Sequence, residues 1–148
     1  MAGDTFFKIG DIKGEAQDAK HKDEIEVMSW SWGVAQPGSM SVGGGGGAGK
    51  ASFSDLTNLL KACASGKHIP EATITSRKAG EGQQEYLIVK LTDVIITNVS
   101  SGGSGGDVME NGAMQFAKME LEYKPQKPDG SLDAGVFFKY DLKQNKTY

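Results

Sequence analysis

One segment that is apolar on both faces limits the possible folds of this chain more than any other feature. Residues 85–99 read EYLIVKLTDVIITNV, and isoleucine, valine, leucine and threonine occupy both sets of alternating positions. Such side chains favour extended backbone, and a strand with two apolar faces must be covered on both sides. We therefore expect a long buried strand, either continuous or divided by a bulge.

Other segments repeat with the period of two that is typical of strands. In 136–142 the even positions are apolar, which predicts a strand with one buried face. The apolar positions change from odd to even within 25–32 and from even to odd within 114–123. A change of phase predicts a bulge, or a strand whose second face is also covered. Shorter strands are expected at 6–9 and 72–77.

One segment has helical periodicity. Leu56, Leu59, Leu60 and Cys63 fall on a single apolar stripe, and Gly66 is placed to end the helix in the left-handed conformation. Strands separated by turn signals, with only one helix, favour a β-sandwich or a small β-barrel. A length of 148 residues fits one domain.

Glycine is the one residue type in clear excess. The 21 glycines concentrate in two runs, GGGGGAG at 43–49 and GGSGG at 102–106. Glycine has the most backbone freedom to lose on ordering, so such runs are flexible by composition. We therefore expect a single domain over 1–148 with flexible loops near 37–50 and 101–107.

The first glycine run is one residue short of a phosphate-binding loop. Residues 44–51 read GGGGAGKA, whereas that loop needs serine or threonine after the lysine to bind magnesium. Ala51 stands at that position, and no alternation of strands and helices follows. A nucleotide hydrolase therefore remains a minor alternative, which an ATP-binding titration would test.

Two further groups of reactive side chains favour structural roles. His21, Asp23 and Glu24 are close neighbours in the sequence, and neighbours usually diverge, so a solvated loop is favoured over a metal site. Cys63 and His68 suggest a thiol and its base, but Cys63 lies on the apolar helix stripe and is better explained as a buried structural cysteine. We expect no catalytic residues, no metal site and no cofactor.

Charge and composition exclude several classes of protein. The net charge is −3 and the pI is near 5.4, which argues against nucleic-acid binding through bulk positive charge. A single cysteine excludes an intramolecular disulfide and a multi-cysteine zinc site. The longest aliphatic runs have three residues, so we expect no membrane insertion. The first residues lack the layout of a signal peptide.

The segment EVMSWSWG at 26–33 places large and small side chains on opposite faces of a strand. Trp30 and Trp32 share one face, and core packing explains both rings. Ser29 and Ser31 then point the other way. In an oligomeric tube or barrel, a small polar residue opposite a packed aromatic face would line an aqueous lumen.

Six stretches of the sequence carry a resemblance to known proteins: FFKIGDIKGEAQD at 6–18, HKDEIEVMSWSWGVAQ at 21–36, ACASGKHIPEA at 62–72, EYLIVKLTDVIIT at 85–97, NGAMQFAKMELEYKPQ at 111–126 and YDLKQNK at 140–146. In this order they resemble the haemolysin-coregulated protein (Hcp) family of type VI secretion systems. The resemblance covers nearly the whole chain. Similar proteins carry a longer segment between the strand near Phe53 and the helix that ends at Cys63.

The resemblance implies a compact β-barrel with one flanking helix, similar to phage tail-tube proteins. It also implies a structural protein rather than an enzyme: hexameric rings stack into a tube inside a contractile sheath, with a VgrG-type spike at the tip. Small effector proteins can travel in the lumen. The subunit would be made in the bacterial cytoplasm and reach the outside through the secretion apparatus, without a signal peptide.

Within this interpretation, Ser31 and Ser29 are the candidates for facing the lumen and its cargo. The candidates for contacts between subunits or between rings belong to the glycine-rich segment and are Gly43, Gly44, Gly45, Gly46, Gly47, Gly49 and Lys50. A released ring that acts as a free extracellular binding module remains an alternative. Deleting the gene and measuring the secretion of other effectors would distinguish the two.

Overall fold

The apolar strand segments pair into one antiparallel sheet that curves round on itself. The computed structural model describes residues 3–33, 47–53, 56–78, 82–104 and 107–148. In chain order the elements are β1 Gly3–Ile9, β2 Ile25–Glu26, β3 Trp30–Gly33, β4 Gly47–Phe53, α1 Leu56–Ser65, β5 His68–Lys78, β6 Glu85–Ser104, β7 Asp107–Tyr123, β8 Val136–Asp141 and β9 Lys146–Thr147.

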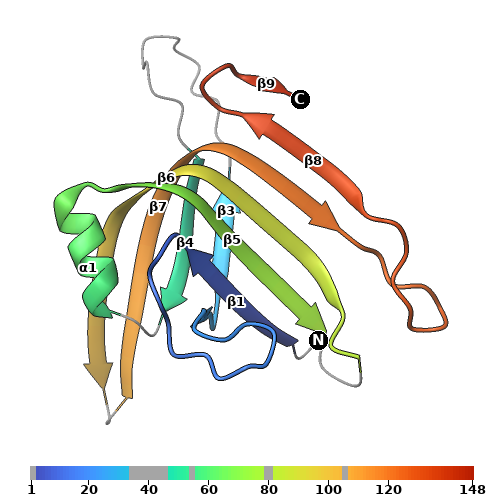
Figure 1. Ribbon diagram of the computed structural model, residues 1–148, viewed down its shortest axis with the longest axis horizontal. Helices are drawn as coiled ribbons and strands as arrows, with labels where there is room; N and C mark the ends of the chain where they lie inside the picture. Colours follow the sequence, from blue (N-terminus) through green and yellow to red (C-terminus); the bar gives the residue numbers. More distant parts are fainter. Residues whose placement is uncertain (1–2, 34–46, 54–55, 79–81, 105–106) are drawn as a thin grey trace.

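The order of the strands brings the two ends of the sheet close together along the chain. Neighbouring strands follow the order β2-β1-β5-β6-β7-β4-β3, with β8 paired to β7 and β9 to β8. The end strands β2 and β3 are consecutive in the sequence, so the sheet nearly returns to its start (Figure 1). Within the described ranges β2 and β3 are not paired, so the sheet is not closed into a barrel. The predicted mainly β fold with one flanking helix is confirmed.

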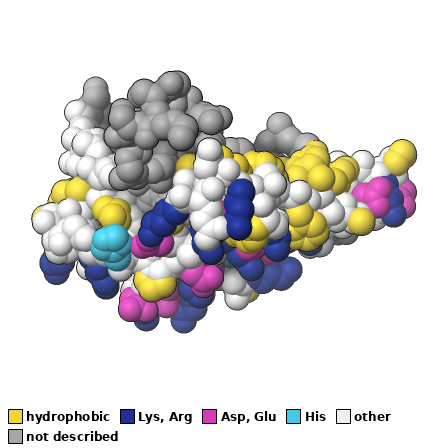
Figure 2. Space-filling model, turned by 90° about the horizontal axis from the view of Figure 1, so that it is seen from above, with side chains coloured by type: hydrophobic (Ala, Val, Ile, Leu, Met, Phe, Trp, Pro, Cys, Tyr) yellow, Lys and Arg dark blue, Asp and Glu magenta, His cyan; other side chains and the backbone are white. Residues whose placement is uncertain are grey.

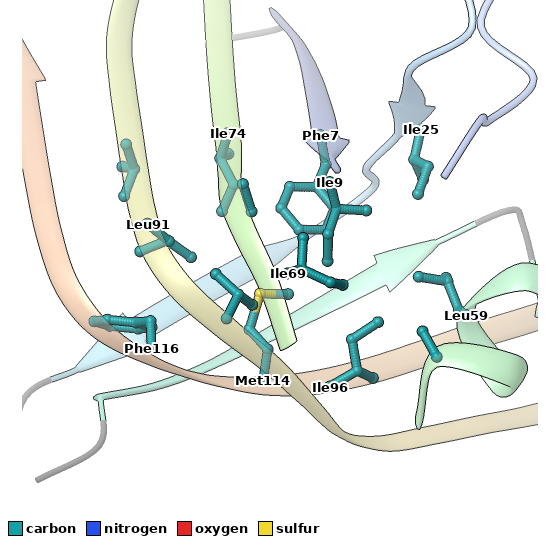
Figure 3. Packing of buried hydrophobic residues seen from close by; sticks show 14 of the residues in the cluster. Phe7, Ile9, Ile25, Leu59, Ile69, Ile74, Leu91, Ile96, Met114 and Phe116 are labelled. Carbon is teal, nitrogen blue, oxygen red and sulfur yellow. The ribbon is translucent and has the colours of Figure 1, made fainter. Parts of the chain in front are cut away.

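The long apolar segment forms the central strand of the sheet. β6 pairs with β5 on one side and β7 on the other, and side chains from these strands join Leu59 of α1 in one buried cluster (Figure 3). The largest fully buried side chains come from β1, β2, α1, β6 and β7 and are Phe7, Ile9, Ile25, Leu59, Met119, Val89 and Val94.

The predicted changes of phase coincide with a bend and with a break. In β6 and β7 the pairs Val94–Phe116 and Leu91–Met119 are all buried although their spacing is odd. Asp93 lies between them with a φ of 56°, and both strands bend strongly along their length (Figure 1). In 25–32 the phase changes because the backbone leaves the sheet between β2 and β3.

Individual residues at that break follow the sequence pattern only in part. Trp30 packs against the hydrophobic core, as predicted. Met28 was predicted on the same face, but its side chain is 81% exposed. The prediction is wrong for Met28 because it lies in the connection between the strands, where alternation no longer fixes the direction of a side chain.

Helix α1 begins at Leu56 and covers one side of the barrel. Leu59 and Ala62 are buried, whereas Leu60 is 43% exposed, so the predicted stripe is wrong at Leu60. Gly66 has a φ of 61° and its N–H donates to the Cys63 carbonyl at 3.2 Å, which confirms the predicted end of the helix.

The glycine-rich runs are shorter as loops than expected. β4 begins at Gly47 and includes Gly49 and Lys50, so the predicted loop over 37–50 is wrong for its last residues. The predicted loop over 101–107 is likewise wrong for 101–104 and for Asp107, since β6 continues to Ser104 and β7 begins at Asp107, whereas 105–106 lie outside the described residues. Pairing with neighbouring strands satisfies the backbone groups and outweighs the low strand propensity of glycine. Gly43, Gly44, Gly45 and Gly46 lie outside the described residues.

The C-terminal strand is less buried than its alternation predicts. Val136 and Phe138 are 61% and 40% exposed, whereas Leu142 is buried. The prediction of one buried face is wrong for the first part of β8, because this part extends beyond the barrel (Figure 1).

Candidate functional site

The serine face predicted in β3 continues across three further strands. Ser31 pairs with Lys50 of β4, Lys50 pairs with Ala113 of β7, and Ala113 pairs with Asn98 of β6. Residues that are directly opposite in an antiparallel sheet project from the same face. Ser31, Ala113 and Asn98 therefore belong to one surface, although the sequence separates them by more than half of the chain.

The other face of the same strands belongs to the core. Trp30 and Val99 lie in the next row and pack against the buried hydrophobic cluster. Met114 and Ile96 are paired in the row on the other side of Ser31 and are both buried. This part of the sheet therefore has one apolar face and one exposed polar face, as the alternation in 26–33 predicts for Trp30 and Ser31.

The polar face is hollowed into an open cavity of about 540 Å³. Its lining residues come from β3 and the residue before it, and from β6 and β7, and are Ser29, Trp30, Ser31, Asn98, Ser100, Asn111, Gly112 and Ala113. Hydroxyl and amide groups can donate and accept hydrogen bonds, so these residues can bind polar protein surfaces.

Sequence reasoning found only part of this surface. Ser29 and Ser31 were recognised from their alternation with tryptophan, and the structure places both at the cavity. Asn98, Ser100 and Asn111 were missed. Their polar character within otherwise apolar strands is a signal, but only the register of β6 against β7 brings them to the serines.

The group of His21, Asp23 and Glu24 does not form the fully solvated loop that the sequence favoured. His21 is buried, and its ring stacks on Phe6 with 4.5 Å between centroids. Hydrogen bonds join its Nδ1 to Glu24 and its Nε2 to Glu85, both at 2.9 Å. The solvated-loop prediction is therefore wrong for His21. In the described part of the chain, no cluster of three or more His, Cys, Asp and Glu side chains could hold a metal ion.

A buried arginine also contacts the Phe6 ring. The Arg77 guanidinium is 4.8 Å from the centre of the Phe6 ring and is paired with Asp18 at 2.6 Å and Asp4 at 3.0 Å. The hydrogen bond from Arg77, followed by the backbone N–H of Lys20, holds the pKa of Asp18 well below its ordinary value. This cluster fixes the segment after β1 against β5 and stabilises the fold.

Cys63 and His68, the suggested thiol and base, have different partners in the structure. Cys63 packs against the hydrophobic core from α1. His68 Nδ1 is hydrogen-bonded to Asp93 at 2.9 Å, and the other carboxylate oxygen of Asp93 accepts from Lys143 at 2.8 Å. These hydrogen bonds, from Lys143 first and then from His68, lower the pKa of Asp93. The arrangement joins β5, β6 and the C-terminal segment.

The strand position of Lys50 also bears on the nucleotide alternative. Lys50 lies inside β4 and is paired on both sides, whereas a phosphate-binding lysine follows a loop at the start of a helix.

Within the described ranges, the structure has no helix long and apolar enough to cross a membrane.

Comparison with known proteins agrees with the resemblance seen in the sequence. The family described as "Type VI secretion system effector, Hcp" matches residues 6–123. Protein hcp1 of Pseudomonas aeruginosa is 50% identical over an alignment of 159 residues that covers 98% of each chain. Because the alignment is longer than the 148 residues of this chain, the relative has residues that this chain lacks.

Solved structures give the same result. Hcp1 from Salmonella typhimurium has a TM-score of 0.81 at 38% identity, with all of both chains covered. A type VI secretion system effector from Yersinia pestis has a TM-score of 0.74 at 38% identity, covering 94% of this chain and 100% of the other. The chain therefore belongs to the Hcp family of type VI secretion proteins, a family of structural inner-tube subunits and not of enzymes.

Proposed function

We propose that this chain forms hexameric rings that stack into a secreted tube, with the polar face of β3, β6 and β7 lining the lumen and binding small effector proteins. The observation that carries this proposal is the contrast between the two faces of one sheet. Trp30 and Val99 pack into the core, whereas Ser31 and Asn98 are exposed on the opposite side. A curved wall between a core and a water-filled channel requires this pattern.

The edges of this part of the sheet support a ring. β3 pairs with β4, and in the described residues no strand covers its other edge. β5 pairs with β6 only from Glu85 to Ile95, so in the described residues no strand pairs with the second edge of β6 at 98–104. The two edges differ from each other, and contacts between unlike surfaces generate a closed ring when the rotation between neighbouring copies closes. Uncovered edges pair readily with other strands.

The lining chemistry supports a role as a carrier. The serine and asparagine side chains at the cavity offer both donors and acceptors of hydrogen bonds, so they can hold different cargo proteins and release them. The sheath and a VgrG-type spike are the further partners that this role requires. We also propose that the subunit is made in the bacterial cytoplasm and leaves it as part of the tube.

Ser31→Tyr tests the lumen assignment. A large ring at this position fills the cavity, so an effector that co-purifies with the wild type should be retained about tenfold less or worse, while ring assembly is unchanged. Thr57→Tyr is the matched control, because Thr57 is an exposed hydroxyl residue on α1. The measurement is a pull-down with particle size recorded in parallel. Equal retention by the wild type and Ser31→Tyr would contradict the proposal.

A further inference from the structure

The first part of β8 presents an apolar surface that the fold leaves uncovered. Tyr123, Val136 and Phe138 are 46%, 61% and 40% exposed. This part of β8 projects from the barrel (Figure 1), and hydrophobic side chains gather on that side of the molecule in the view from above (Figure 2). Soluble proteins rarely expose grouped large apolar side chains without a binding role.

The surface is a continuation of the core. Phe138 pairs with Leu121, which pairs with the buried Val89. Val136 pairs with Tyr123 in the next row. These residues share one face, which we call the inner β8 face: Tyr123, Val136 and Phe138. An apolar face therefore runs from the centre of the barrel onto a strand that nothing in the described structure covers.

The backbone at the same place is also available. β9 pairs with β8 only at Tyr140 and Asp141. The outer edge of β8 at Val136–Phe138 therefore ends the sheet within the described part of the chain. Natural proteins usually protect such edges with charges, proline or a covering element, and here the edge carries valine and phenylalanine.

The charged side chains of these two strands lie on the opposite face, so they do not favour a charged partner for the inner β8 face. Glu120 pairs with Lys139 and Glu122 with Phe137 in the sheet register, and on that opposite face Lys139 lies 3.9 Å from Glu120. The surface selects a partner by apolar contact and shape. A neutral apolar surface carried by every subunit of a tube suits a neighbouring subunit, which is always present at the same position.

We propose that the inner β8 face and the adjoining strand edge dock onto a second copy of this chain within the ring. This proposal rests on the ring assembly proposed above and assigns one of its contact surfaces. In the ring, Val136 and Phe138 become buried against the neighbouring barrel, which completes the apolar face that starts at Val89. Phe137 pairs with Glu122 and projects from the opposite face, so it takes no part in this contact.

The two faces of β8 supply a matched test. Val136→Lys and Phe138→Lys place a charge on the inner β8 face, and each should raise the protein concentration needed for half assembly about tenfold or more. Phe137→Lys makes the same change at a side chain that is 62% exposed, against 61% for Val136, and should assemble like the wild type. Particle mass is measured by light scattering after size-exclusion chromatography, and thermal unfolding confirms that each variant folds.

Hydrogen exchange on the wild-type protein tests the contact without a substitution. The amides of residues 136–139 should exchange more slowly in assembled rings than in the diluted, dissociated protein. Wild-type rings with normal assembly of both inner-face variants, or with no added protection at 136–139, would overturn this inference and leave the ring proposal intact. A wild-type chain that stays monomeric at all concentrations would overturn both.

Discussion

At the scale of single residues, the polar cluster around Phe6 is the least expected part of the molecule. His21 stacks on this ring and Arg77 lies 4.8 Å from its centre, and both are buried. A buried charge is tolerated only when it is paired and hydrogen-bonded. Arg77 meets this condition through Asp18 and Asp4.

The low pKa of Asp18 predicts a specific response to acid. A carboxyl group whose pKa is lowered by folding stabilises the protein above its ordinary pKa, near about 4, and this contribution is lost as the pH falls toward the pKa in the folded state. The stability advantage of the wild type over Asp18→Asn should therefore be greatest at neutral pH and shrink below about pH 4. Urea unfolding across pH 2 to 7 measures it.

Replacing Arg77, the partner of Asp18, gives a second test by the same measurement. In Arg77→Met the free energy of unfolding should also fall less steeply between about pH 4 and pH 2 than in the wild type, because the hydrogen bond from Arg77 is the main cause of the low pKa of Asp18. Parallel stability curves for the wild type and Asp18→Asn between pH 2 and 7 would show that the pair contributes nothing to acid sensitivity.

At the scale of elements, α1 shows how far a periodic pattern predicts packing. The stripe of apolar residues located the helix and its end at Gly66. It could not distinguish Leu59, which is 1% exposed, from its neighbour Leu60, which is 43% exposed. The difference depends on how the helix is rotated against β6, which is a property of the packed structure.

This pair of leucines gives a prediction for the helix. Leu59→Ala should lower the free energy of unfolding by about 2–5 kcal/mol, because it removes buried methyl groups and leaves a cavity. Leu60→Ala should lower it by less than about 1 kcal/mol, because much of the side chain already contacts water. Chemical denaturation of both variants measures the difference. Similar losses for the two substitutions would contradict the observed orientation of α1.

The elements that the sequence did not predict share one physical cause. Gly47, Gly49 and Lys50 were expected in a loop, but pairing with β3 and β7 holds them in a strand. Val136 and Phe138 were expected to be buried, but β8 lies where the barrel cannot cover it. Local composition and alternation contain no information about which strands become neighbours, and these residues depend on that choice.

At the scale of the whole molecule, the fold class follows from the sequence and the candidate site follows only in part. The periodicity predicted a mainly β chain with one helix. The alternation with Trp30 predicted that Ser31 lies on the polar face. The polar surface needs the register that brings Asn98 and Asn111 beside Ser31. Since those contacts join distant parts of the chain, only the folded structure can show them.

The central claim is that copies of this chain close into a ring whose open centre is lined by the polar face. Electron microscopy of the purified protein tests it most directly, because a ring and its channel are visible without any knowledge of the cargo. Closed rings of one size with six-fold symmetry and an open centre are the predicted result, with Ser31 and Asn98 on the channel wall at higher resolution. Uniform monomers, or rings with the Trp30 face turned to the channel, would contradict the account.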